Sequence, residues 1–271
     1  MARPEYLRLS LMAGLLSALS ACAYQPVRDG PAPAGGVQTT RNLPPDPEPR
    51  DEPRSKFGNG PYYQVFGKTY KVLDTNFGYQ ERGVASWYGS KFHGQPTSSQ
   101  ETYDMYAMTA AHKSLPIPSY VRVRNLQNGK SIIVRVNDRG PFVDNRLIDL
   151  SYAAAVKLDL IETGTGLVEV TAISFDEPPA NAQRMPDVTS PPTIPAEHIY
   201  VQVGAFGDAE NARRRFIMLH DLGFEEAFVH LDQSSALYRV RIGPIADVLQ
   251  YDSIVERLQN VGISDTHLVT D

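Results

Sequence analysis

Short runs in which apolar and polar residues alternate, separated by turn residues, dominate the chain between Gly83 and Ile173. Alternation with a period of two places successive side chains on opposite faces of a strand. The pattern predicts strands over Gly83–Trp87, Tyr120–Asn125, Ser131–Asn137 and Leu167–Ala172. Asn128-Gly129 between the second and third of these predicts a hairpin with a type I′ turn, which needs positive φ at both positions.

The pattern changes to a helical one at Ser151–Leu158, for which Ser151 is the expected N-cap. Just before the strand-rich region, Tyr62–Leu73 contains β-forming residues in partial alternation and predicts one or two short strands packed on the main domain. About ninety residues with many strands and one or two helices fit a small closed barrel. We therefore expect a mostly β domain over residues 62–176.

A different order of elements follows near the C-terminus, over residues 197–271. The patterns predict strand, helix, strand, strand, helix and strand over Tyr200–Ala205, Ala209–Leu222, Phe228–Leu231, Leu237–Ile242, Val248–Gln259 and His267–Val269. Gly223 is the expected glycine at the end of the first helix. Two β-α-β repeats of this kind predict an α+β sandwich of ribonucleoprotein type, βαββαβ.

Two proline-rich stretches with few large apolar residues separate these units, at residues 22–61 and 177–196. Such compositions cannot bury a core and predict disordered linkers. The whole chain has 271 residues and a formal net charge of -5 without a long basic run, which argues against a nucleic-acid partner. No apolar span follows the first twenty-odd residues, so we do not expect the mature chain to cross a bilayer.

The first 21 residues have the features of a secretory signal. Arg3 and Arg8 precede an apolar run over Leu9–Leu19, which is too short for a comfortable membrane span. Leu19-Ser20-Ala21-Cys22 resembles a bacterial lipobox, and Cys22 is the only cysteine. The resemblance implies that Cys22 is lipidated and anchors the chain to a membrane, and Ala23 after it resembles the outer-membrane sorting pattern. A plain signal peptide with an incidental thiol is the alternative.

Glu101 and Asp104 are the first candidates for chemistry. They lie three residues apart in a segment rich in Thr, Ser, Gln and Tyr, and a turn there would direct both carboxylates to one groove. Mutual repulsion would raise one pKa and leave the other acid ionised, which suits proton donation to a glycosidic oxygen. The same spacing also describes an ordinary surface pair. No spacing of His, Asp or Cys predicts a metal site, and we expect no cofactor.

Other candidates each have a structural alternative. Asp138 ends an alternating strand, where it could stand on the rim of the same groove or stabilise a turn. His112 could orient a carboxylate, but a lone histidine is more often a satisfied hydrogen-bonding residue, and the same holds for His93. Trp87 and Tyr88 could line a sugar-binding groove or pack in the core.

Five ordered blocks resemble the family of septal rare lipoprotein A, an endolytic lytic transglycosylase of bacterial peptidoglycan. They are Gly83-Val84-Ala85-Ser86-Trp87-Tyr88-Gly89, Phe92-His93-Gly94, Glu101-Thr102-Tyr103-Asp104, Ala111-His112-Lys113-Ser114-Leu115-Pro116 and the run from Val134 to Pro141. The resemblance implies a double-psi β-barrel, with Glu101 as general acid/base and Asp104 as its electrostatic partner. It also implies a 1,6-anhydromuramyl product, because the muramyl 6-hydroxyl is the nucleophile.

The chain departs from the family pattern close to this acid. Gln100 stands where a glycine is common, and Ser98 and Gln95 replace an alanine and a basic residue. The loop backbone at Glu101 could therefore differ. Expansin-like relatives bind glycan without cleaving it, so a non-catalytic wall-binding protein is the alternative function.

The blocks from Tyr200 to Phe206 and from Tyr238 to Pro244 resemble the SPOR domain. That resemblance implies binding to peptidoglycan strands stripped of stem peptides, gathering at division septa, and possible contacts with divisome proteins. Alternation places Gln202, Gly204, Arg239 and Arg241 on the open face of the sheet, where polar groups suit sugars. An RNA-recognition module would need stacking aromatic residues at the centre of that face, and we expect no aromatic residue at those positions. A plain solvated face is a further alternative.

Overall fold

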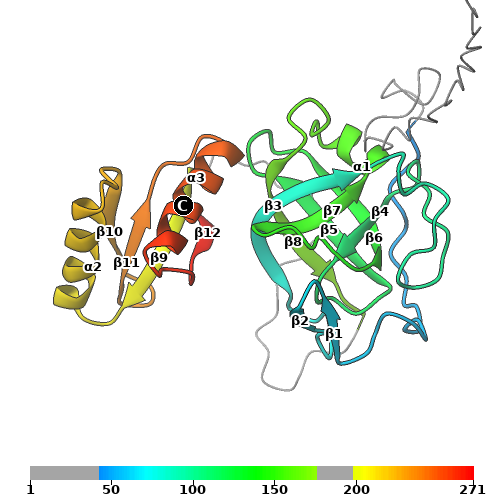
Figure 1. Cartoon of the computed structure of the whole chain (residues 1–271), viewed down its shortest axis with the longest axis horizontal. Helices are drawn as coiled ribbons and strands as arrows, with labels where there is room; N and C mark the ends of the chain where they lie inside the picture. The colour runs from blue at the N-terminus through cyan, green and yellow to red at the C-terminus, as the bar shows by residue number, and fades with distance from the viewer. Residues whose placement is uncertain (1–42, 176–197) are drawn as a thin grey trace, which may run out of the picture.

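The computed structural model describes residues 43–175 and 198–271, which form two domains lying side by side (Figure 1). The first is built around a closed barrel of six strands and the second around a four-stranded sheet. The barrel elements are β3 (Gln80–Tyr88), β4 (Thr109–His112), β5 (Ser119–Asn125), β6 (Ser131–Asp138), β7 (Arg146–Ser151), α1 (Tyr152–Lys157) and β8 (Gly166–Ile173).

The barrel closes in the order β3-β7-β4-β6-β5-β8. Two of its pairings are parallel, β3 with β7 and β4 with β6, and the others are antiparallel. Alternate residues of the strands fill the interior, as with Val121, Val123, Val134 and Val136, which are fully buried. The expected double-psi β-barrel is confirmed, with its mixed parallel and antiparallel pairings.

The four expected barrel strands and the helix are present, and the Ser151 side chain caps α1 by accepting from the backbone N–H of Ala154. Strands β4 and β7 were not predicted, because each is short and pairs with neighbours far away in sequence. The hairpin between β5 and β6 is present, but its turn is not type I′. Gly129 has φ +72 whereas Asn128 has a negative φ, and the N–H of Gly129 closes a longer loop onto Asn125.

Residues 43–61, which we call the N-terminal strap, were expected to be part of a disordered linker, and the structure corrects this. The strap has no regular secondary structure but is tied to the barrel by polar contacts. Asp46 accepts from the backbone N–H of Ile133 at 2.7 Å and from Lys157 Nζ at 2.7 Å. Asn59 donates to the carbonyl of Ile117 at 2.6 Å. Specific hydrogen bonds thus add to the packing of Leu43 against the barrel core in holding the strap.

The expected short strands after the strap are confirmed as an antiparallel hairpin of β1 (Tyr62–Val65) and β2 (Lys68–Lys71). The rings of Tyr63 and Tyr70 stack with centroids 5.2 Å apart, and Phe142 packs against both. The Tyr63 hydroxyl donates to the carbonyl of Lys113 at 2.7 Å. This aromatic cluster attaches the hairpin to the barrel.

The second domain has the expected βαββαβ order. It consists of β9 (Ile199–Phe206), α2 (Ala209–Asp221), β10 (Ala227–Asp232), β11 (Leu237–Ile242), α3 (Val248–Asn260) and β12 (His267–Thr270). The sheet order is β10-β11-β9-β12, with all neighbours antiparallel. Asp208 and Asp247 cap the two helices through their carboxylates, and Gly223 follows α2 with φ +80 as expected.

The two domains are in contact. Arg146 Nη1 lies 3.3 and 3.2 Å from the two carboxylate oxygens of Asp252 on α3, and Gln127 donates to the carbonyl of Ala246 at 2.9 Å. Apolar barrel residues, among them Leu126 and Leu167, belong to the same buried cluster as the core of the second domain. The interface therefore combines apolar packing with an ion pair and hydrogen bonds.

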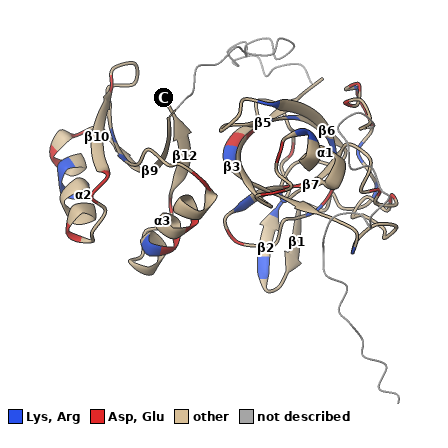
Figure 2. Ribbon diagram, turned by 90° about the horizontal axis from the view of Figure 1, so that it is seen from above, with Lys and Arg blue, Asp and Glu red and all other residues tan. Residues whose placement is uncertain are grey.

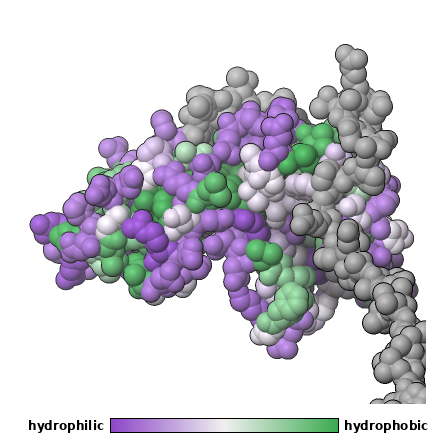
Figure 3. All heavy atoms as spheres, turned by 45° about the horizontal axis from the view of Figure 1, so that its top comes forward, coloured by the Kyte–Doolittle hydropathy of each residue, from purple (hydrophilic) through white to green (hydrophobic). Residues whose placement is uncertain are grey.

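Charged residues of both signs are distributed over both domains in the view of Figure 2. On the face shown in Figure 3, polar residues predominate and apolar ones form small separate groups. No helix within residues 43–175 and 198–271 is long and apolar enough to span a membrane. The expected signal peptide, Cys22 and the linker over 177–196 lie outside the described residues.

Candidate active site

Glu101 lies on a loop between β3 and β4, and its carboxylate is held by side chains of β6. Arg135 Nη1 donates to Oε2 at 2.7 Å and Nη2 donates to Oε1 at 2.9 Å, which makes a bidentate ion pair. The side-chain amide of Asn137 donates to Oε2 at 2.7 Å. Arg135 and Asn137 are two apart on one strand, so both point to the same face. The Glu101 side chain remains 42% exposed and is accessible to a ligand.

This arrangement lowers the pKa of Glu101. Hydrogen bonding to Arg135 is the largest cause, burial acts in the opposite direction, and Asn137 lowers the pKa further. We had expected repulsion between Glu101 and Asp104 to keep one of the two acids protonated. Asp104 is not among the groups that shift Glu101, and the direction at Glu101 is downward. The structure therefore presents Glu101 as a carboxylate.

Asp138 anchors the loop that carries Glu101. Its Oδ1 accepts from the backbone N–H and the hydroxyl of Ser98, both at 2.7 Å, and from the backbone N–H of Arg139 at 2.7 Å. The loop is closed further by the N–H of Thr97, which donates to the carbonyl of Glu101 at 2.7 Å. These contacts show turn stabilisation by Asp138, and its place on the rim of a shared groove stays a prediction. The serine that departs from the family pattern adds a hydrogen bond.

Gln100 explains how the loop keeps its shape without the common glycine. Its φ is +70, in the left-handed region that glycine adopts at little cost. A non-glycine residue there costs about 1–2 kcal/mol. The hydrogen bonds from Ser98, Arg135 and Asn137 to either side of the loop offset that cost.

Asp104 lies apart from this pair. Its Oδ1 accepts from the backbone N–H of Tyr106 at 3.0 Å and is 3.7 Å from Nδ1 of His93. The Asp104 side chain is 54% exposed. No hydrogen bond or ion pair joins it to Glu101 or Asp138 in the described part of the chain. The structure therefore brings Glu101 and Asp138 together through one loop and places Asp104 beside His93.

His112 is a structural residue in this fold, because its side chain is buried and only 1% of the residue is exposed. Its Nδ1 accepts from the backbone N–H groups of Ser114 and Leu115 at 3.2 and 3.0 Å, which places the proton on Nε2. Nε2 is 2.8 Å from the hydroxyl of Tyr79, which donates to Glu81 at 2.8 Å. The expected catalytic assignment of His112 does not fit this burial.

Burial lowers the pKa of His112 to about 3, and the charges of Arg139 and Lys113 act in the same direction. The folded pKa lies below the value of about 6.5 for an unfolded histidine, so stability is present above pH 6.5 and is lost as the pH falls towards 3. We expect His112 to cost about 2–3 kcal/mol of unfolding free energy between pH 7 and pH 4.5. Urea denaturation at the two pH values measures it.

The control is the His112→Asn variant, which keeps a hydrogen-bond acceptor but does not titrate. It should be less stable than the wild type at pH 7 and should lose less stability on acidification. An equal loss in both proteins would contradict the assignment, because carboxylates would then account for the whole acid sensitivity.

The aromatic candidates divide between groove and core. Tyr88 is 8% exposed, and its ring stacks on Tyr103 with centroids 4.1 Å apart. Trp87 is half-buried and packs edge-on against Tyr152 at 5.7 Å. Core packing, the alternative interpretation, describes Tyr88. Trp87 retains some exposed surface.

The candidate binding face of the second domain is less open than expected. Gln202 and Arg241 are each only 8% exposed. Arg239 pairs with Asp232 at 2.8 Å and donates to Gln202 at 3.3 Å, and Arg241 pairs with Asp271 at 3.1 Å. The three side chains share one face, but each is already engaged by other protein groups.

A β-bulge on this sheet changes one assignment. The register between β11 and β9 shifts between Val240 and Arg241, so Gly204 pairs with the buried Val240 and does not share the face of Arg241. Tyr200, on the central strand β9, does stand on that face, contrary to the expectation of no aromatic residue there. Its ring is 9% exposed and contacts Phe228 and Arg241.

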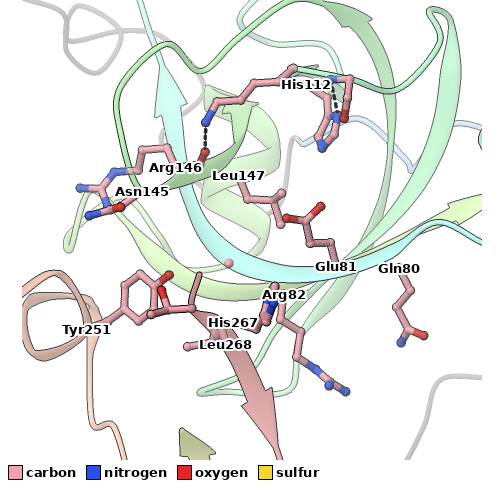
Figure 4. Close-up of a pocket in the computed structure, with 14 residues that line it drawn as sticks. Gln80, Glu81, Arg82, His112, Asn145, Arg146, Leu147, Tyr251, His267 and Leu268 are labelled. Atoms are coloured by element: carbon pink, nitrogen blue, oxygen red, sulfur yellow. Dashed lines mark hydrogen bonds between the residues drawn. The ribbon is translucent and has the colours of Figure 1, made fainter. Parts of the chain in front are cut away.

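A cavity of about 470 Å³ lies between the two domains. Figure 4 shows Glu81 and Arg82 of β3 and Arg146 of β7 facing His267 and Tyr251 of the second domain around it. None of the candidate acids lines this cavity, so its size says nothing about their chemistry. In the parts of the chain that are described, no three His, Cys, Asp or Glu side chains are grouped to hold a metal ion.

Sequence reasoning missed the residues that hold Glu101. Arg135 and Asn137 carried a usable signal, because they occupy alternate positions of the strand that ends in Asp138. Glu52 carried none. It lies in the strap, 83 positions from Arg135, yet its Oε2 accepts from Arg135 Nη2 at 2.8 Å and its Oε1 accepts from Nε at 3.1 Å.

Comparison with known proteins agrees with this architecture. Residues 80–171 match the family described as lytic transglycolase, and residues 195–269 match the SPOR domain. The chain is 38% identical to the endolytic peptidoglycan transglycosylase RlpA of Pseudomonas aeruginosa strain UCBPP-PA14, over 96% of this chain and 94% of that protein. For the protein of the same name from Vibrio cholerae the identity is 39%, over 83% and 82%. The Neisseria meningitidis serogroup A protein is 46% identical over 56% of this chain and 58% of its own length. By these matches the chain belongs to the RlpA family of endolytic peptidoglycan transglycosylases.

Proposed function

We propose that the protein is a lytic transglycosylase that cleaves the β-1,4 bond between N-acetylmuramic acid and N-acetylglucosamine in peptidoglycan glycan strands. The observation that carries the proposal is the accessible carboxylate of Glu101, fixed by Arg135 and Asn137 on a loop that Asp138 anchors. Membership of a family whose curated members are named endolytic peptidoglycan transglycosylases supports the same reaction.

Glu101 acts as acid and then as base. In its protonated form it donates a proton to the glycosidic oxygen as the bond from that oxygen to the muramyl anomeric carbon breaks. The muramyl 6-hydroxyl attacks the same carbon, and its proton returns to Glu101. The product is a 1,6-anhydromuramyl end, and no water is consumed. Asp138 positions the loop, and Asp104, with His93, lies within the same exposed segment and contacts the glycan.

The second domain recruits the enzyme to its substrate. Arg239, Arg241 and Gln202 bind glycan strands that lack stem peptides, after the ion pairs with Asp232 and Asp271 rearrange. Cys22 carries the lipid anchor in the outer membrane, and Trp87 contributes an aromatic surface to the glycan site. In this proposal the protein acts on the periplasmic side of the envelope at the division septum, where it takes part in wall remodelling, daughter-cell separation and contacts with divisome proteins.

Mass spectrometry of the sugars released from peptide-free sacculi tests the reaction. We expect 1,6-anhydromuramyl ends and strand fragments of several disaccharides. Reducing ends in their place would indicate a hydrolase and overturn the lyase assignment. Sacculi that retain their stem peptides are the comparison, and we expect less release from them.

A non-catalytic wall-binding protein is the second candidate, and one observation favours it. Because Arg135 lowers the pKa of Glu101, only a small fraction of the protein carries the proton that cleavage needs at neutral pH. If purified wild-type protein binds peptide-free sacculi but releases nothing from them between pH 5 and 8, the binding function is the correct one.

A further inference from the structure

The guanidinium of Arg135 lies between two carboxylates from distant parts of the chain. Its Nε and Nη2 donate to Glu52 of the strap at 3.1 and 2.8 Å, and its Nη1 and Nη2 donate to Glu101 at 2.7 and 2.9 Å. Each carboxylate takes one edge of the planar group. Two bidentate pairs on one arginine fix both its position and its orientation.

Like Arg135, Glu52 is mostly buried and makes several hydrogen bonds. The Glu52 side chain is 16% exposed, and its Oε1 also accepts from the hydroxyl of Tyr120 on β5 and from Nε of Arg50 at 3.0 Å. The Arg135 side chain is 18% exposed. The strap therefore inserts a negative charge, largely shielded from solvent, beside the candidate acid.

We propose that Glu52 is a positioning residue for the cleavage reaction. It holds Arg135 at the correct place beside Glu101, and its negative charge limits the stabilisation of the Glu101 carboxylate by Arg135. Glu101 can then take up the proton that it delivers to the glycan. This inference rests on the proposed function, because it gives Glu101 the acid role.

The groups that face Glu101 support this division of labour. They are Arg135 and Asn137 from β6, which lower its pKa, and Glu52 from the strap, whose charge raises it. Arg135, followed by Tyr120 and Arg50, lowers the pKa of Glu52 itself to about 2, against the effect of burial. Glu52 thus carries its negative charge at neutral pH, where cleavage is assayed.

The test is the Glu52→Gln variant, which keeps the shape of the side chain and removes its charge. Above the pKa of Glu101, kcat/KM for peptide-free glycan strands should fall tenfold per pH unit, in proportion to the protonated fraction. In the variant, kcat/KM should be about three- to tenfold lower at every pH in this range. Its dependence on pH should have the same slope, and the binding affinity should be unchanged. Glu52→Asp restores the charge and should recover most of the activity.

Asp46→Asn is the matched control. Asp46 anchors the same strap through Ile133 and Lys157, and within the described residues no hydrogen bond or ion pair joins it to Arg135. We expect its activity to stay within about twofold of wild type, since it loosens the strap without changing the charge beside Glu101. Equal losses in Asp46→Asn and Glu52→Gln would overturn the proposal, because strap anchoring alone would then explain both. A value of kcat/KM for Glu52→Gln that is equal to or higher than that of the wild type would overturn it as well.

A second measurement separates this proposal from the proposed function. Titration of the Glu101 carboxyl by ¹³C NMR should show proton uptake at lower pH in Glu52→Gln than in wild type, whether or not the protein cleaves glycan. The Glu101→Gln variant in the kinetic assay decides the acid role. If Glu101→Gln stays active, the proposed function loses its acid, and the NMR shift still decides whether Glu52 tunes Glu101.

Discussion

Replacing Glu101 by Gln should abolish strand cleavage, with a loss of at least about 10²–10⁴-fold in the rate of product release. The amide has nearly the shape of the acid but can neither deliver a proton to the glycosidic oxygen nor recover one from the 6-hydroxyl. It can still accept hydrogen bonds from Arg135 and Asn137, so the loop should keep its position. Anhydro ends released from peptide-free sacculi, quantified by mass spectrometry, provide the measurement.

Binding provides the control for this experiment. The second domain is untouched by the substitution, so cosedimentation of the variant with sacculi should match the wild type. Lost binding together with lost cleavage would indicate misfolding. Retained cleavage would remove Glu101 from the mechanism and direct attention to Asp104 and His93, the other exposed titratable pair in this region.

Arg139→Met should destabilise the barrel by about 3–5 kcal/mol. Arg139 is 8% exposed and donates to three main-chain carbonyls, that of Gly58 in the strap at 2.8 Å and those of His112 and Leu115, at and just after the end of β4, at 3.2 and 2.5 Å. Its Nη2 also reaches Oδ1 of Asn59 at 3.2 Å. Methionine fills similar volume but removes the guanidinium donor from the three carbonyls, whereas Asn59 Oδ1 keeps the backbone N–H of Ile117 as a donor. The strap then loses its attachment to β4.

Thermal unfolding measures this effect, and we expect the melting temperature of the barrel transition to fall by roughly 10 °C. Lys68→Met is the comparison, because Lys68 is 60% exposed and makes only a surface ion pair with Asp144. That variant should change the unfolding free energy by less than about 1 kcal/mol. If the two variants behaved alike, the network around Arg139 would not be a source of stability.

Much of the fold was predictable because its signals are local. The helix over Tyr152–Lys157 begins after an N-cap serine, and β11 has the predicted bounds Leu237–Ile242. Each depends on neighbours within a few positions along the chain. The turn type at Asn128-Gly129 was predicted wrongly. The loop there contains the four residues between Asn125 and Lys130, whereas a type I′ hairpin turn contains two.

The candidate site was predictable only in part. The candidate acid Glu101 and Asp138, which anchors its loop, were both identified from their motifs. The bidentate hold of Arg135 on Glu101, the burial of His112 and the stacking of Tyr88 on Tyr103 were not. Motifs preserve residue types, but the same type can face solvent or the core, and only packing decides which.

By itself, the sequence determined the order of the domains, the positions of most strands and helices, and the candidate acid, Glu101. Periodicity, helix caps and motifs depend on residues that are close together in sequence, so they can be recognised without the tertiary structure. The tertiary structure decided the parallel pairings of β4 with β6 and of β7 with β3, the ordered path of the strap, and the charges that surround Glu101. Arg135 meets Glu101 across 34 positions and Glu52 across 83, and contacts at such separations exist only once the barrel has closed.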